Sequence, residues 1–67
     1  MMEKLLMTRM ECANQIYRVA SELRYNIDSV IEAAESHERD TELSYEINAR
    51  QNIQTLVQLL QVMDDLS

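Results

Sequence analysis

The sequence has 67 residues, contains no glycine or proline, and carries a net charge of −6. A chain of this length forms one domain at most. Its acidic balance argues against binding to nucleic-acid phosphates, which requires clustered lysine and arginine, and no apolar run is long enough to cross a membrane. Because glycine and proline most often break a helix, their absence favours helix over nearly the whole chain.

The first predicted helix covers about residues 9–36. Apolar residues recur there at heptad spacing, which predicts a helix with one apolar stripe. One core series consists of Leu6, Ala13, Ala20, Ile27 and Ala34, and the other of Met2, Ile16, Leu23 and Val30. Thr8 and Glu11 match a capping box, in which each side chain satisfies a free backbone N–H at the start of a helix. The alternative is a helix that begins at residue 2.

A second predicted helix covers about residues 41–66. Its apolar series, in which Ile53 and Leu60 alternate with Ala49, Leu56 and Met63, does not continue the phase of the first. The break falls in residues 35–42, which contain no large apolar side chain, and predicts a turn at about residues 37–40. Asp40 or Thr41 is the expected N-cap of the second helix. The predicted fold is therefore all-α, with residues 1–67 forming a single antiparallel two-helix hairpin.

Two helices cannot enclose a full hydrophobic core, so the hairpin needs further support. Cys12 is the only cysteine and His37 the only histidine, which leaves neither a disulfide nor a well-supplied metal site. We therefore expect oligomerisation or a partner chain to complete a helical bundle. The apolar stripes are widest at the end of the hairpin opposite the turn, here called the open end. The predicted partner-binding residues are Met2, Leu5, Leu6, Met10, Leu56, Leu59, Met63 and Leu66.

The residues that carry chemistry in other proteins do not form a catalytic pattern in this sequence. His37 lies among acidic residues, and a hydrated turn is the simplest interpretation of that cluster. Cys12 has no base near it, because the one histidine lies at the other end of the hairpin. We therefore predict a non-enzymatic protein without catalytic, cofactor-binding or metal-binding residues. The N-terminal segment lacks a signal-peptide pattern, and the single cysteine fits a reducing compartment, so a cytoplasmic location is expected.

The plan of the chain resembles the small helical-hairpin chaperones of bacterial type III secretion systems, the YscE-like group. The similarity consists of an amphipathic first helix, a polar turn, Tyr45 early in the second helix, and an apolar C-terminal half that ends in residues 62–66. It implies a chaperone or co-chaperone that covers an apolar helix of a secretion-system subunit. The alternative is a small regulator or inhibitor, of the kind phages encode, that docks on a larger enzyme through the apolar patch or the acidic turn. Either function requires a protein partner or a second copy.

Overall fold

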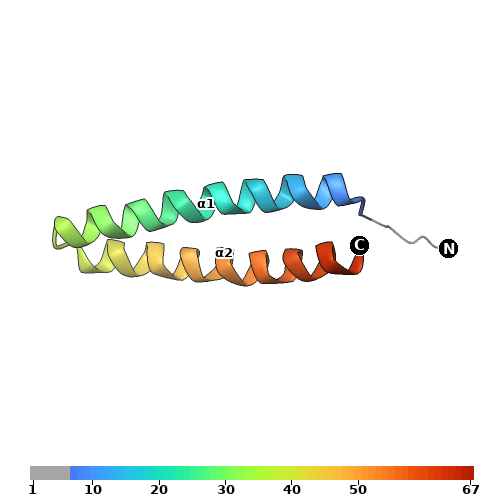
Figure 1. The fold of residues 1–67 in the computed structure, drawn as a ribbon. Coiled ribbons are helices and arrows are strands. Elements are labelled where there is room, and N and C mark those ends of the chain that lie inside the picture. The colour runs from blue at the N-terminus through green and yellow to red at the C-terminus, as the bar shows by residue number, and fades with distance from the viewer. Residues whose placement is uncertain (1–6) are drawn as a thin grey trace.

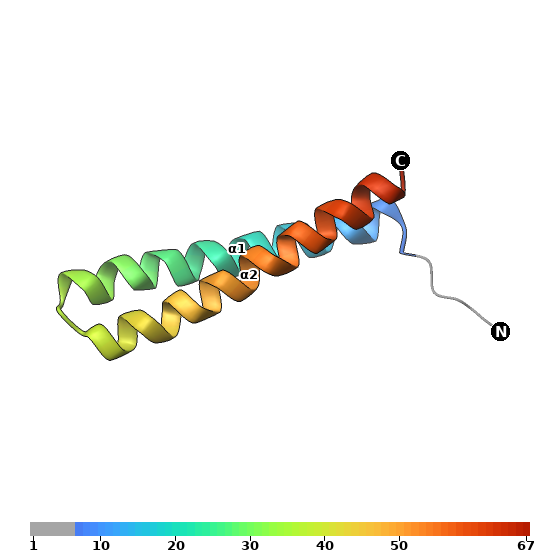
Figure 2. The same ribbon diagram turned by 90° about the horizontal axis from the view of Figure 1, so that it is seen from below.

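The computed structural model describes residues 7–67, which form two long helices joined by a tight turn. Helix α1 spans Arg9–Glu35 and helix α2 spans Arg39–Asp65. The helices run antiparallel and stay next to each other from the turn to the open end (Figure 1), as the perpendicular view also shows (Figure 2). The predicted all-α hairpin is therefore confirmed, and both helices lie within two residues of the expected boundaries.

Helix α1 begins at the capping box that the sequence predicts. Thr8 has an extended backbone, and its Oγ1 accepts a hydrogen bond of 3.1 Å from the backbone N–H of Glu11. In return, the Glu11 carboxylate accepts one of 2.9 Å from the backbone N–H of Thr8. These bonds satisfy two N–H groups that a helix start leaves without partners. They set the first residue of α1 at Arg9.

The turn consists of residues 36–38 and depends on the backbone of His37. With φ at 58°, His37 occupies the left-handed region that usually favours glycine. Its N–H donates to the carbonyl oxygen of Ala34 at 3.1 Å, and the N–H of Glu38 donates to that of Ala33 at 2.9 Å. This is the Schellman arrangement that closes the C-terminus of a helix. The turn therefore reverses the chain without any glycine.

The predicted N-cap of the second helix was wrong. Glu38, rather than Asp40 or Thr41, is the N-cap of α2, and no side chain accepts a capping hydrogen bond there. The left-handed residue 37 reverses the chain so sharply that helical geometry resumes at Arg39. Asp40 and Glu42 instead lie in the first turn of α2, where negative charge interacts favourably with the helix dipole.

We expect His37→Gly to raise the free energy of unfolding by about 0.5–1 kcal/mol, because glycine removes the steric cost of a left-handed backbone. Urea unfolding at one fixed protein concentration measures the change. Ser36→Gly is the matched control, since φ of Ser36 is −89° and glycine there only adds freedom to the unfolded chain. Equal destabilisation by both variants would contradict the role given to residue 37.

The interface between the helices is narrow. Its buried residues are Cys12, Asn26 and Ala33 of α1 and Ala49 and Leu59 of α2. Half-buried side chains extend the same two stripes, and they include Ile16, Val19, Leu23, Val30, Tyr45, Asn52, Leu56 and Met63. The stripes follow heptad spacing, as in an antiparallel coiled coil.

One predicted core series of α1 and part of the series of α2 were wrong. Ala13, Ala20, Ile27 and Ala34 are exposed, and the residues that immediately precede them, Cys12, Val19, Asn26 and Ala33, face α2 instead. In α2, Ile53 and Leu60 are exposed, and Asn52 and Leu59 take their place. Each misplaced residue therefore follows a true interface residue by one position, which rotates it by about 100° around its helix.

A polar pair lies within the interface that the structure shows. Asn26 is only 9% exposed, and its side-chain Nδ2 donates to Oδ1 of Asn52 at 2.6 Å across the interface. A buried amide is tolerated only when it is hydrogen-bonded. Because each asparagine supplies the partner that the other needs, the interface tolerates Asn26 and Asn52 beside the exposed isoleucines Ile27 and Ile53.

Candidate protein-binding face

The hairpin has two broad faces, and one of them is polar. A groove on this face is lined by side chains of both helices, including Arg18, Ser21, Glu22, Asn48 and Gln51. Glu22 and Asn48 each immediately precede a residue of the interface, namely Leu23 and Ala49. Residues in this position of an antiparallel pair lie on the same side of both helices.

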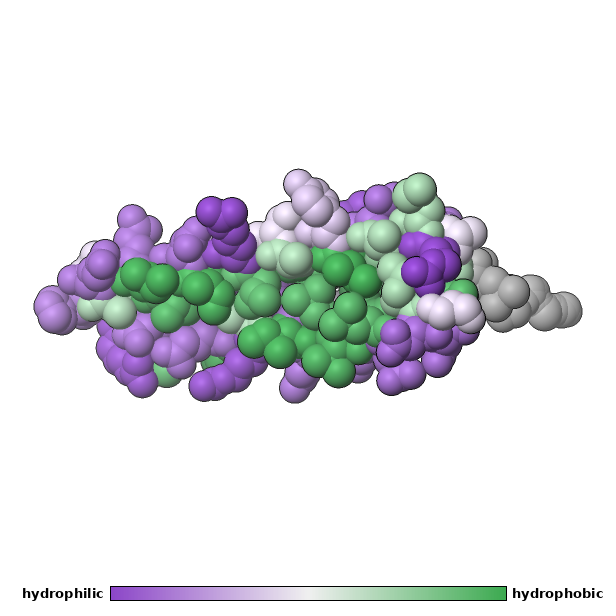
Figure 3. Space-filling model, in the orientation of Figure 1, coloured by the Kyte–Doolittle hydropathy of each residue, from purple (hydrophilic) through white to green (hydrophobic). Residues whose placement is uncertain are grey.

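The opposite face carries most of the exposed apolar side chains. It is built from the apolar residues among those that immediately follow interface residues, together with Met10; Arg24, Glu46, Arg50 and Asp64 occupy the other positions of this kind. We call it the apolar face, and it consists of Met10, Ala13, Tyr17, Ala20, Ile27, Ile31 and Ala34 of α1 and Leu43, Ile53, Val57 and Leu60 of α2. Figure 3 shows this side of the molecule, on which apolar side chains form a band along the hairpin over both helices.

The side chains of the apolar face are exposed to an unusual degree for their size. Met10 is 71% exposed, Tyr17 76%, Val57 62%, Leu60 54% and Ile53 47%. Single exposed apolar residues are normal on a protein surface, but a contiguous band of them marks an interaction site. The arrangement therefore identifies a surface suited to packing against another apolar surface.

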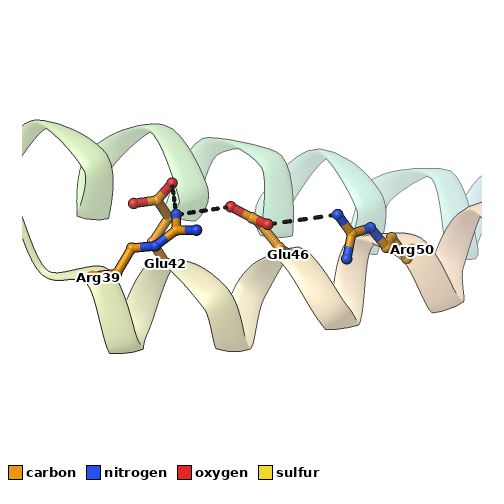
Figure 4. Close-up of polar contacts among 4 residues, drawn as sticks. All are labelled: Arg39, Glu42, Glu46 and Arg50. Carbon is orange, nitrogen blue, oxygen red and sulfur yellow. Dashed lines mark hydrogen bonds and ion pairs between the residues drawn. The ribbon is translucent and has the colours of Figure 1, made fainter.

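A short chain of ion pairs occupies the α2 part of this face nearer the turn (Figure 4). Arg39 contacts Glu42 at 2.9 Å and Glu46 at 3.6 Å, and Glu46 also contacts Arg50 at 3.7 Å. These two carboxylates and two guanidinium groups sum to zero charge. Exposed pairs of this kind contribute little to stability, but together these four side chains add no net charge to this part of the face.

The predicted partner-binding residues are distributed over three environments. Met2, Leu5 and Leu6 lie outside the described residues. Met10 lies on the apolar face. Leu56, Leu59, Met63 and Leu66 lie along the side of α2 that packs on α1, with Leu59 only 8% exposed. Partner binding by these residues stays a prediction. The most exposed side chains of the apolar face, which are Met10, Tyr17, Val57 and Leu60, lie in the half of the hairpin nearer the open end.

At the open end, contacts within the chain join the start of α1 to the C-terminal part of the chain. The Arg9 guanidinium donates to the carbonyl oxygen of Met63 at 3.3 Å and to Oγ of Ser67 at 2.9 Å. Cys12 is fully buried, and its thiol donates to the carbonyl oxygen of Leu59 at 3.3 Å. These hydrogen bonds join the start of α1 to the C-terminal part of α2 and to Ser67.

Sequence reasoning missed the exposure of Ile27, Ile53 and Leu60, which it assigned to the core. A signal for it exists in α1, where two heptad series run one residue apart, one through Cys12 and the other through Ala13. Two adjacent series on one helix are typical of a helix that packs against neighbours on two sides.

Two tyrosines of the two helices contact each other near the turn. The ring of Tyr25 packs edge-to-face on that of Tyr45, with centroids 6.0 Å apart. A hydrogen bond with the Tyr25 side chain raises the pKa of the Tyr45 hydroxyl above its ordinary value of 10.0. Tyr45 therefore stays protonated near neutral pH. Within residues 7–67, no three His, Cys, Asp or Glu side chains are grouped so as to hold a metal ion.

Neither α1 nor α2 combines the length and the apolar character that a membrane-spanning helix needs. Comparisons of the chain with models of protein families, with curated proteins and with solved structures gave no significant match.

Proposed function

We propose that this protein is a non-enzymatic helix-binding module whose apolar face packs against helices of a further polypeptide chain to complete a helical bundle. The observation that carries the proposal is the apolar face itself, which extends over both helices and leaves Tyr17, Val57 and Leu60 more than half exposed. Its mechanism is burial of apolar surface, which contributes roughly 25 cal/mol per Å² removed from water.

The shape of the molecule supports this function. The Cα radius of gyration is 15.4 Å, whereas a compact domain of 67 residues has a value of about 11 Å. A single layer of two helices has no second layer to cover its broad faces, and domains normally bury such faces against another layer. The apolar face is therefore the surface against which that second layer would pack.

The partner that fits is an amphipathic helix or pair of helices, because the exposed residues of α1 and α2 keep heptad spacing. A chaperone or co-chaperone that covers an apolar helix of a secretion-system subunit is the most specific function of this kind. A regulator or inhibitor that docks on a larger enzyme would use the same face. The ion pairs of Arg39 and Arg50 neutralise Glu42 and Glu46 on the part of this face nearer the turn, which favours the apolar face over the acidic turn as the contact surface.

Site-specific photo-crosslinking in the native cells tests the proposal. A photoreactive phenylalanine analogue would replace Val57 on the apolar face or, as the matched control on the same helix, Gln51 on the polar face. We expect protein adducts from position 57 and few from position 51. Adducts from position 51 alone, or equal adducts from both positions, would contradict binding through the apolar face. A partner with an apolar helix that aggregates when this protein is deleted would favour the chaperone over the inhibitor.

A further inference from the structure

We propose that a second copy of this chain covers the apolar face, and that the two hairpins pack with their turns at opposite ends to form a four-helix bundle. The inference rests on the function proposed above, because it names the chain that occupies the same face. Three observations support it: the size of the face, its width of two helices, and the distribution of charge along the hairpin.

The size of the face matches what a stable dimer buries. The hairpin measures 51 × 20 × 14 Å, so the whole broad side that carries the apolar face, polar positions included, has a projected area on the order of 1,000 Å². Specific protein interfaces of standard size bury about 800 Å² from each partner. A single helix laid on the hairpin would cover only part of a face to which both α1 and α2 contribute.

A second hairpin supplies the required second layer. The apolar face spans both helices, each of 27 residues or about 40 Å. A matching surface must therefore offer two helices of similar length with apolar residues at heptad spacing. A second copy presents that surface by construction, and two-fold symmetric dimers are the commonest oligomers.

Charge decides the orientation of the two copies. Residues 28–46, around the turn, contain seven carboxylates and only one cationic side chain, Arg39, for a net charge of −6. Of the described residues nearer the open end, 7–27 sum to +1 and 47–67 sum to −1. Turns at the same end would bring together two regions of −6 each, whereas turns at opposite ends place each acidic region beside a segment without net charge.

Sedimentation equilibrium of the purified full chain at micromolar concentration tests the presence of the dimer. We expect a dimer whose dissociation constant rises at least tenfold in Ile53→Ala, because each copy loses apolar contact at the interface. Gln51→Ala, on the polar face of the same helix, should leave the constant unchanged. Circular dichroism at the same concentration verifies that both variants remain helical. A monomeric wild type, or equal effects of both variants, overturns the proposal.

Spin labels at the turn test the orientation without altering the face. Glu38→Cys provides an exposed attachment site, and the fully buried Cys12 makes the unsubstituted chain the blank control. We expect a distance of about 40 Å or more between the labels of the two copies, since each 27-residue helix separates the turn from the open end. A distance of about 20 Å or less would place the turns together and overturn the arrangement. If the purified protein is a monomer but position 57 still gives adducts in cells, the proposed dimer is wrong. The proposed helix-binding function would then stand.

Discussion

Leu59→Asp is expected to unfold the hairpin. Leu59 is 8% exposed and packs against α1, where its carbonyl oxygen also accepts the hydrogen bond from the Cys12 thiol. A carboxylate at this position would be buried without a partner, and a small protein has little stability to offset that cost. Far-ultraviolet circular dichroism should show loss of most of the helical signal at 25 °C.

Leu59→Ala gives the same test in a graded form. Removing a buried leucine side chain costs about 2–5 kcal/mol of unfolding free energy, which urea unfolding at fixed protein concentration measures. Gln58→Ala is the control, because Gln58 is the adjacent exposed residue of the same helix and should change stability by less than about 0.5 kcal/mol. A cost below about 1 kcal/mol for Leu59→Ala would show that this leucine does not hold the helices together.

The second large effect concerns the asparagine pair. Asn26→Leu leaves the Asn52 amide in the interface without its partner at 2.6 Å, and we expect a loss of about 1–3 kcal/mol in unfolding free energy. Combining Asn26→Leu with Asn52→Leu replaces the pair by two apolar side chains that contact each other. The double variant should recover the lost stability or exceed that of the unsubstituted protein.

A double-mutant cycle makes this prediction quantitative. If the two asparagines act as a pair, the summed losses of unfolding free energy in the two single variants should exceed the loss in the double variant by at least about 1 kcal/mol. Additive single effects would mean that each amide finds its own solvent or backbone partner. The stable double variant should also lose its single packing arrangement of α1 on α2, because Ile27 and Ile53 then compete equally for positions in the interface. Its near-ultraviolet dichroism and amide exchange should report a more mobile interface.

Local chemistry was sufficient to predict the helices. The capping box of Thr8 and Glu11 involves residues three positions apart, and it marks the start of α1 in both sequence and structure. The absence of glycine and proline and the break in apolar phase between the helices predicted one hairpin rather than one long helix. The turn was less predictable, because His37 adopts a backbone conformation that sequence reasoning assigns to glycine. The expected turn, residues 37–40, is longer than the observed turn, residues 36–38. The expected N-cap of α2 was therefore placed too far along the chain.

The sequence by itself determined that this chain is an acidic helical hairpin with more apolar surface than two helices can hide, because helix periodicity, capping and net charge depend on residues close together in the chain. It did not determine which stripe of each helix faces inward. Two apolar series run side by side on α1, and the choice between them depends on what α2 places opposite. Only the tertiary structure, in which Asn26 meets Asn52 across the interface, decided that Leu59 is buried while Ile53 and Leu60 lie on the apolar face.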